Sequence, residues 1–238
     1  MTDFALQGSE IPYSFGEAYR SQPGKASAAK RSGVMAGSLP NVLQSICQPQ
    51  VSLAIWQRRL PLSIQQRMAA LCVLMPRHEM TTLSPGAPTD PALDKVLRGF
   101  HGTPVDARDA WRTDLQLLIA LARNLAPQAL LRVHIETRAC NPGQQFHVDH
   151  AALRLICTYR GQGTQWLPKT AFDRCASAGE SNARIRDWSA LQEIPSGAVA
   201  VMKGNRFPDQ PGQGLLHRSP SASVAAPRVL AMVDIDFV

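Results

Sequence analysis

The second half of the chain reads as a series of short strands, and this pattern constrains the fold more than any other feature. After Pro127, apolar runs of five to seven residues follow one another, separated by turn sequences rich in Gly, Pro and Asn. These runs are Leu131–Glu136, Leu153–Tyr159, Ala198–Met202 and Val229–Ile235. Because helices do not alternate regularly with these strands, the pattern predicts an antiparallel barrel or jelly roll, not a parallel α/β sheet.

The first half predicts elements that pack outside this barrel. Val51–Trp56 is predicted to be a strand, and a helix is expected to begin at Ser63. The clearest helix of the chain begins at Thr103, where a capping hydroxyl precedes a proline, and it ends at Pro127. Residues 80–104 contain several prolines and are predicted to be a loop.

These elements predict an α+β fold with a C-terminal antiparallel barrel or jelly roll and supporting N-terminal helices. Residues 1–41 are rich in Ser, Gly, Ala and Pro and are predicted to be a flexible N-terminal segment. A chain of 238 residues favours one core, so residues 42–238 are expected to form one domain. Residues 168–195 are expected to be an insertion, part helical around residues 183–191.

Composition places the chain among soluble cytoplasmic proteins. No apolar stretch reaches the length of a membrane span, and the N-terminus lacks the pattern of a signal peptide. The five cysteines include no CxxC pair, and their odd number argues for reduced thiols. The net charge of +7 is spread thinly, without a Lys/Arg run of the kind that binds nucleic acid.

A cluster of metal-binding side chains lies in Gln145–His150, which reads QFHVDH. On an extended segment, His147 and Asp149 share a face because they are two residues apart. A third candidate ligand, His217, follows the predicted strand Ala198–Met202. Two imidazoles and one carboxylate form the facial triad of non-haem Fe(II) sites. The alternative is a structural hydrogen bond between His147 and Asp149.

The order HVD, distant His and Arg resembles the Fe(II)/2-oxoglutarate dioxygenase superfamily, whose fold is the double-stranded β-helix. The stretches FHVDHAALRLICTYRGQGTQWLP and GLLHRSPSASVAAPRVLAMVDID also resemble a bacterial family known as domain of unknown function 1826. The superfamily resemblance implies that His147, Asp149 and His217 bind Fe(II). It also implies that Arg228, eleven residues after His217, grips the far carboxylate of 2-oxoglutarate in a two-pronged ion pair.

Further side chains are predicted to line the cavity of this fold. Arg154 and Tyr159 lie on a predicted strand and are candidates for binding the co-substrate. Thr164 and Trp166 follow that strand and are candidates for contact with the substrate. For each of them, a role in the core or in a turn is the structural alternative.

A second metal site can be drawn from thiols and imidazoles. Cys140, His147, His150 and Cys157 have the spacing Cys-x6-His-x2-His-x6-Cys and offer a tetrahedral set for zinc. This spacing matches no standard zinc knuckle, and the segment would have to fold back on itself. Zinc therefore stays an alternative to iron.

The predicted function is a non-haem Fe(II)- and 2-oxoglutarate-dependent oxygenase that acts on a small molecule. Twelve of the fourteen basic residues after residue 110 are arginine, which favours an anionic substrate. Nucleic acid is not expected as a partner, because the nucleic-acid dealkylating enzymes of the superfamily use a second arginine shortly after the first, and Val229–Val238 contains none. The alternative is a cupin-like protein that binds a divalent metal such as zinc without oxygenase turnover. The oligomeric state is open.

Overall fold

The structure of the chain is a computed structural model, and part of the chain is described in it. The described residues are 33–70, 77–100, 105–139, 145–173, 182, 185–208 and 214–237. The expected flexible segment therefore lies largely outside the described residues.

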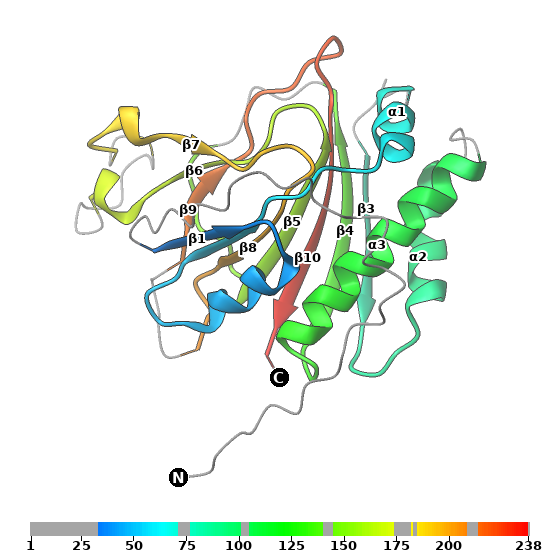
Figure 1. The fold of residues 1–238 in the computed structure, drawn as a ribbon, viewed down its shortest axis with the longest axis horizontal. Coiled ribbons are helices and arrows are strands. Elements are labelled where there is room, and N and C mark those ends of the chain that lie inside the picture. The colour runs from blue at the N-terminus through cyan, green and yellow to red at the C-terminus, as the bar shows by residue number, and fades with distance from the viewer. Residues whose placement is uncertain are drawn as a thin grey trace.

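Seven strands form the larger of two sheets, in the order β1-β2-β8-β5-β10-β4-β3 (Figure 1). They are β1 (Val34–Gly37), β2 (Leu53–Trp56), β3 (Arg77–Leu83), β4 (Leu130–Arg138), β5 (Leu153–Arg160), β8 (Val199–Lys203) and β10 (Arg228–Asp236). Neighbouring strands are antiparallel, except that β1 and β2 are parallel. The strands predicted after Pro127 are β4, β5, β8 and β10, and they form the centre of this sheet.

The smaller sheet has the order β7-β6-β9, with β6 (Gln165–Leu167), β7 (Gln192–Glu193) and β9 (Leu216–Arg218). A bridge between His147 and His217 places the segment before β5 alongside β9. From β4 onward the chain passes back and forth between the two sheets, as in a double-stranded β-helix. The predicted fold class is thus confirmed.

Three helices cover the outer face of the large sheet, away from the small sheet (Figure 1). They are α1 (Leu62–Ala70), α2 (Thr89–Leu97) and α3 (Val105–Leu125). Short 3-10 turns are η2 (Pro40–Cys47), η3 (Arg98–Phe100), η4 (Lys169–Ala171) and η6 (Trp188–Ala190). None of the helices in the described ranges is long and apolar enough to cross a membrane.

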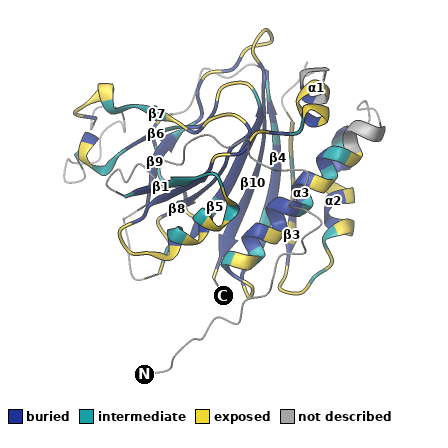
Figure 2. Cartoon of the chain, in the orientation of Figure 1, coloured by how far each residue is buried: buried dark blue, intermediate teal, exposed yellow. Residues whose placement is uncertain are grey.

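Side chains alternate between two cores along each central strand. On β10, Val229 and Val233 pack in the core beneath the helices, whereas Leu230 and Met232 pack in the core between the sheets. This period of two follows from the pleat of a strand. Burial on both faces makes β10 continuously buried (Figure 2).

Two boundary predictions are corrected. Residues 80–104 are not a loop, because β3, α2 and η3 occupy most of this range. Pro88 precedes α2 and Pro91 lies in its first turn, where a helix tolerates proline. The domain also begins before residue 42, because β1 pairs with β2 in the large sheet. Part of the predicted insertion, around residues 183–191, is expected to be helical. The described residues of this part contain the single 3-10 turn η6.

Candidate metal centre

A pair of backbone hydrogen bonds brings the two histidines of the predicted triad together. The amide of each residue donates to the carbonyl of the other, with N–O distances of 2.9 Å both ways between His147 and His217. Opposed residues of an antiparallel pair project their side chains to the same face. The two ring centroids accordingly lie 4.6 Å apart.

Asp149 completes the cluster from the same side of the segment. Its Oδ1 lies 3.8 Å from Nε2 of His147, and its Oδ2 lies 3.3 Å from Nε2 of His217. One ligand atom from each of the three residues lies within 4.8 Å of the others. Asp149 and His217 are buried and His147 is partly exposed, while His150 is exposed. The three predicted ligands therefore converge, and His150 is not part of the cluster.

The hydrogen bonds of the imidazoles suit metal binding. Nδ1 of His147 lies 3.0 Å from the carbonyl oxygen of Gln145, and Nδ1 of His217 lies 3.1 Å from that of Leu215. A carbonyl oxygen can only accept, so each Nδ1 carries the proton and each Nε2 presents a lone pair to the cluster. Oδ2 of Asp149 is buried without a hydrogen-bond partner. These three donor atoms fit a divalent metal ion.

The electrostatics favour the protonation states that bind a metal. Burial and the neighbouring His217 lower the pKa of His147, which keeps its ring neutral. Burial opposes ionisation of Asp149, but contacts with His217 and Arg154 outweigh it and lower the pKa of this carboxyl. For His147 and Asp149, the neutral imidazole and the ionised carboxylate are the forms that ligate metals.

Arg154 ties the carboxylate of Asp149 to the large sheet. Its Nη1 donates to Oδ1 of Asp149 at 2.5 Å, and its Nε and Nη2 donate to the two oxygens of Asp234 at 2.6 and 2.9 Å. Because Oδ1 is held in this way, Oδ2 is the oxygen left for a metal. Arg154 lines the cavity as predicted, but two carboxylates engage its guanidinium, so it positions Asp149.

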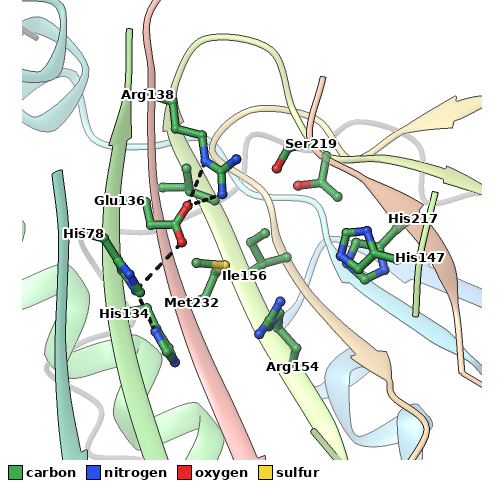
Figure 3. Close-up of a pocket in the computed structure, with 12 residues that line it drawn as sticks. His78, His134, Glu136, Arg138, His147, Arg154, Ile156, His217, Ser219 and Met232 are labelled. Atoms are coloured by element: carbon green, nitrogen blue, oxygen red, sulfur yellow. Dashed lines mark hydrogen bonds and ion pairs between the residues drawn. The ribbon is translucent and has the colours of Figure 1, made fainter. Parts of the chain in front are cut away.

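The cluster faces a cavity of about 200 Å³ between the two sheets (Figure 3). Ile156, Leu230 and Met232 form an apolar floor on β5 and β10. The cavity is also lined by residues that the sequence analysis did not select: His78, His134, Glu136, Arg138 and Ser219. Those on β4, His134, Glu136 and Arg138, are two residues apart and therefore project to the same face of the strand. This spacing is visible in the sequence. His78 lies on β3, in or beside the supposed loop, where no pattern marked it.

Arg228 lies at the start of β10 as a fully buried cation. Its Nε donates to the carbonyl oxygen of Gln162 at 2.7 Å, but its Nη1 and Nη2 are buried without a partner. Burial and the neighbouring Arg138 lower the pKa of Arg228 to about 10. Thr164, which lines the cavity, also has a buried hydroxyl without a partner. An unpaired guanidinium and a free hydroxyl fit the carboxylate of an anionic ligand.

A glycine permits the turn that holds Arg228. Gly161 has a φ of +83°, a conformation that side chains other than hydrogen disfavour. A Cβ at this position would lie 2.5 Å from the carbonyl oxygen of Pro227 and 2.9 Å from Cγ of Arg228. The turn after β5 can therefore approach the arginine only because residue 161 has no side chain.

Among the residues predicted to bind the co-substrate or the substrate, Tyr159 and Trp166, like Arg228, are not among the residues that line the cavity. Tyr159 lies on the helix-facing side of β5, where its hydroxyl donates to Asp114 at 2.6 Å. Successive side chains of a strand point to opposite faces. Tyr159 is an odd number of residues from Arg154, so its side chain faces away from that of Arg154. Trp166 faces inward but packs in the apolar core between the sheets, and its indole NH has no partner.

The zinc alternative conflicts with the same alternation of side chains along β5. Cys157 is buried on the helix-facing side of β5, near Arg58 and away from His147. Burial raises the pKa of its thiol to about 11, which disfavours the thiolate that zinc requires. His150 is exposed, and Cys140 lies outside the described residues. The set of two cysteines and two histidines therefore does not assemble.

Comparison with known sequences places the chain in a family. The sequence profile of the family described as protein of unknown function (DUF1826) matches residues 37–234. The chain belongs to this family. No curated protein matches the sequence.

Several solved structures are similar to this one at low sequence identity. The rice dioxygenase for auxin oxidation is 15% identical, with a TM-score of 0.40, over 74% of this chain and 64% of that chain. This chain thus spans just under two thirds of the length of the rice enzyme. A Pseudomonas putida prolyl-4-hydroxylase is 11% identical, with a TM-score of 0.41, over 83% of this chain and 97% of that chain. JOX2, solved with 2OG, Fe and JA, is 8% identical, with a TM-score of 0.49, over 97% of this chain and 84% of that chain.

Proposed function

We propose that this chain is a non-haem Fe(II)- and 2-oxoglutarate-dependent oxygenase that acts on a small molecule. The observation that carries the proposal is the convergence of His147, Asp149 and His217 on one point beside a cavity. A structural His–Asp pair needs neither the second imidazole nor an oxygen of Asp149 left without a hydrogen bond. Two histidines and one carboxylate on one face leave room for an oxo-acid and dioxygen.

Each residue of the site has a defined task in this proposal. Nε2 of His147, Nε2 of His217 and Oδ2 of Asp149 would hold the metal, and Arg154 orients Asp149. The Nη atoms of Arg228 receive the far carboxylate of 2-oxoglutarate. Bound iron supplies the redox chemistry, in which oxidation of 2-oxoglutarate to succinate and carbon dioxide is coupled to oxidation of a substrate by dioxygen.

The apolar floor and the arginines of the cavity define the surroundings of the substrate. Ile156, Leu230 and Met232 keep water from the reacting atoms and present a surface for a hydrocarbon part. Arg138 on the cavity wall supports the expectation of an anionic group on the substrate. A cytoplasmic location and a small-molecule partner, without nucleic acid or membrane, complete the proposal.

The decisive experiment is anaerobic addition of Fe(II) and then 2-oxoglutarate to the purified protein. An oxygenase is expected to show a weak visible charge-transfer band that requires both additions. His217→Ala is expected to lose the band, and His150→Ala is expected to keep it because His150 is exposed outside the cluster.

The same experiment separates the proposal from a cupin-like metal binder. Stoichiometric binding of iron or zinc by the wild type, without a band and without binding of 2-oxoglutarate, would favour the binder. Elemental analysis of protein purified without chelator gives the metal content for this comparison.

A further inference from the structure

Arg138 and Arg228 lie opposite each other on neighbouring strands. Arg138 ends β4, Arg228 begins β10, and the two residues are cross-strand partners in the antiparallel register. Side chains at directly opposed positions share a face, with Cβ atoms about 5 Å apart. Like charges at such positions repel, so the pair costs stability unless an anion compensates it.

Among the described residues, only one of these two cations is hydrogen-bonded to a carboxylate. Nε and Nη2 of Arg138 donate to Oε2 of Glu136 at 2.8 and 2.6 Å. The Nη atoms of Arg228 are buried and have no partner. In the part of the chain that the structure describes, Glu136 is the one carboxylate that hydrogen-bonds to this pair of arginines.

The bond to Glu136 leaves one edge of the Arg138 guanidinium free. Within the described ranges, Nη1 of Arg138 makes no hydrogen bond. A guanidinium has five N–H groups in a fork, and the Nη1/Nη2 edge can grip a carboxylate with two parallel bonds. Arg138 and Ser219 line the cavity (Figure 3), as does the hydroxyl-bearing residue Thr164.

We propose that Arg138 is a second carboxylate-binding group of the cavity, which takes an acid group of a ligand through its free edge while Glu136 holds the other edge. The identity of that ligand rests on the proposed function. The acid group belongs either to 2-oxoglutarate, shared with Arg228, or to the primary substrate. Both sources offer the same chemistry, a carboxylate that removes the repulsion between two cations.

The first arm of the test measures 2-oxoglutarate. Iron-loaded protein is titrated anaerobically by calorimetry in the wild type, Arg138→Gln and Arg138→Lys. If the co-substrate is the source, Arg138→Gln weakens binding at least about tenfold and lysine restores part of it, because lysine keeps the charge without the fork. Arg132→Gln is the matched control, since Arg132 lies on the same strand and face but bonds to Asp236 at 2.7 Å. It is expected to bind 2-oxoglutarate like the wild type.

The second arm measures a separate carboxylate. Protein with saturating 2-oxoglutarate is mixed with butyrate or with the uncharged butyramide, and binding is detected by saturation-transfer NMR. If the primary substrate is the source, butyrate binds to the wild type and to Arg132→Gln but not to Arg138→Gln, while butyramide binds to none of them. In that case Arg138→Gln keeps its affinity for 2-oxoglutarate.

The proposal is overturned if Arg138→Gln, folded by circular dichroism, binds 2-oxoglutarate and butyrate as the wild type does. It is also overturned if the variant loses butyrate and butyramide equally, because charge recognition then plays no part. If the wild type binds no 2-oxoglutarate, the proposed oxygenase fails separately. Butyrate binding to metal-free protein then decides on Arg138 alone, with loss in Arg138→Gln in its favour and equal binding against it.

Discussion

At the scale of single residues, His147 and His217 show how backbone pairing can prepare the proposed metal site. Their reciprocal amide–carbonyl bonds place the rings side by side before any metal is present. Each Nδ1 donates a hydrogen bond to the backbone carbonyl oxygen two residues earlier, and this bond fixes the direction in which each Nε2 points. Preorganisation of this kind keeps the cost of ordering the ligands out of the binding free energy.

Replacement of His147 or His217 by alanine is expected to abolish stoichiometric Fe(II) binding and to leave the fold nearly intact. Neither ring lies in an apolar core, so the free energy of unfolding should fall by no more than about 1 kcal/mol. Elemental analysis and thermal melting followed by circular dichroism measure the two effects. His150→Ala is the control and should bind iron normally. Unchanged iron content in either variant would refute the triad.

Arg228 is a residue whose proposed function opposes stability. Its pKa is lowered to about 10, so the fold disfavours the charged form that a carboxylate ligand requires. Arg228→Gln is therefore expected to retain iron and to melt no lower than the wild type in the absence of ligand. Its affinity for 2-oxoglutarate should fall at least about tenfold, which corresponds to 1.4 kcal/mol.

Thermal melting with and without 2-oxoglutarate checks both statements. At one hundred times the dissociation constant, ligand should stabilise the wild type by about 2.7 kcal/mol, and Arg228→Gln should gain much less. Arg228→Lys is expected to recover part of the shift. A full ligand-induced shift in Arg228→Gln would place the anchor at another residue.

At the scale of elements, a buried ion pair joins α3 to the residues that follow β2. Nη1 and Nη2 of Arg58 donate to the two oxygens of Asp114 at 2.6 and 2.8 Å, and Tyr159 on β5 donates to Oδ2 at 2.6 Å. Arg58 also donates to the carbonyl oxygen of Gly197 at 3.1 Å. This network fixes where the long helix sits on the sheet, and the sheet in turn carries the cavity residues on its other face.

Asp114→Asn is expected to lower the free energy of unfolding by about 3–5 kcal/mol, because the Arg58 charge would stay buried without a counter-ion. Urea unfolding at neutral pH measures the effect. Asp109→Asn on the exposed side of the same helix is the matched control and should lie within about 0.5 kcal/mol of the wild type. Equal stability of both variants would show that the network does not hold the helix.

At the scale of the whole molecule, the two sheets are joined across the cavity by charge. Arg154 on the large sheet bonds to Asp149 on the segment that pairs with β9, and also to Asp234 on β10. Burial opposes ionisation of Asp234, but contacts with His134 and Arg154 outweigh it and hold the pKa of Asp234 far below its usual value. Stability should therefore depend on pH through this carboxylate.

Asp234→Asn is expected to reduce the free energy of unfolding at pH 7 by about 3 kcal/mol. A depressed folded pKa contributes stability that is complete above the unfolded pKa of about 4 and is lost as the pH falls below it. The difference between wild type and variant should accordingly shrink between about pH 4 and pH 2. Urea unfolding across this range measures it, with Asp109→Asn as the control. A difference that stays constant with pH would exclude Asp234 as the source.

The sequence by itself determined the features that depend on local pattern. Short apolar runs separated by turn residues defined the central strands β4, β5, β8 and β10, and helical periodicity with a proline at each end defined α3. The spacing of His147 and Asp149 put both on one face, and the order of ligands pointed to His217 and Arg228. Each of these inferences needs only the neighbours of a residue in the chain.

Tertiary structure alone decided which strands pair and in which register. Pairing placed His217 against His147, although seventy positions separate them, and it placed Arg138 opposite Arg228. It also recruited the first residues of the supposed loop into β3, a strand that begins before the loop and carries His78 to the cavity. Local pattern states which residues of one strand share a face, but not which face meets the cavity, and so Tyr159 was assigned to the wrong side. That choice depends on the helices and the small sheet covering opposite faces, a contact between distant parts of the chain.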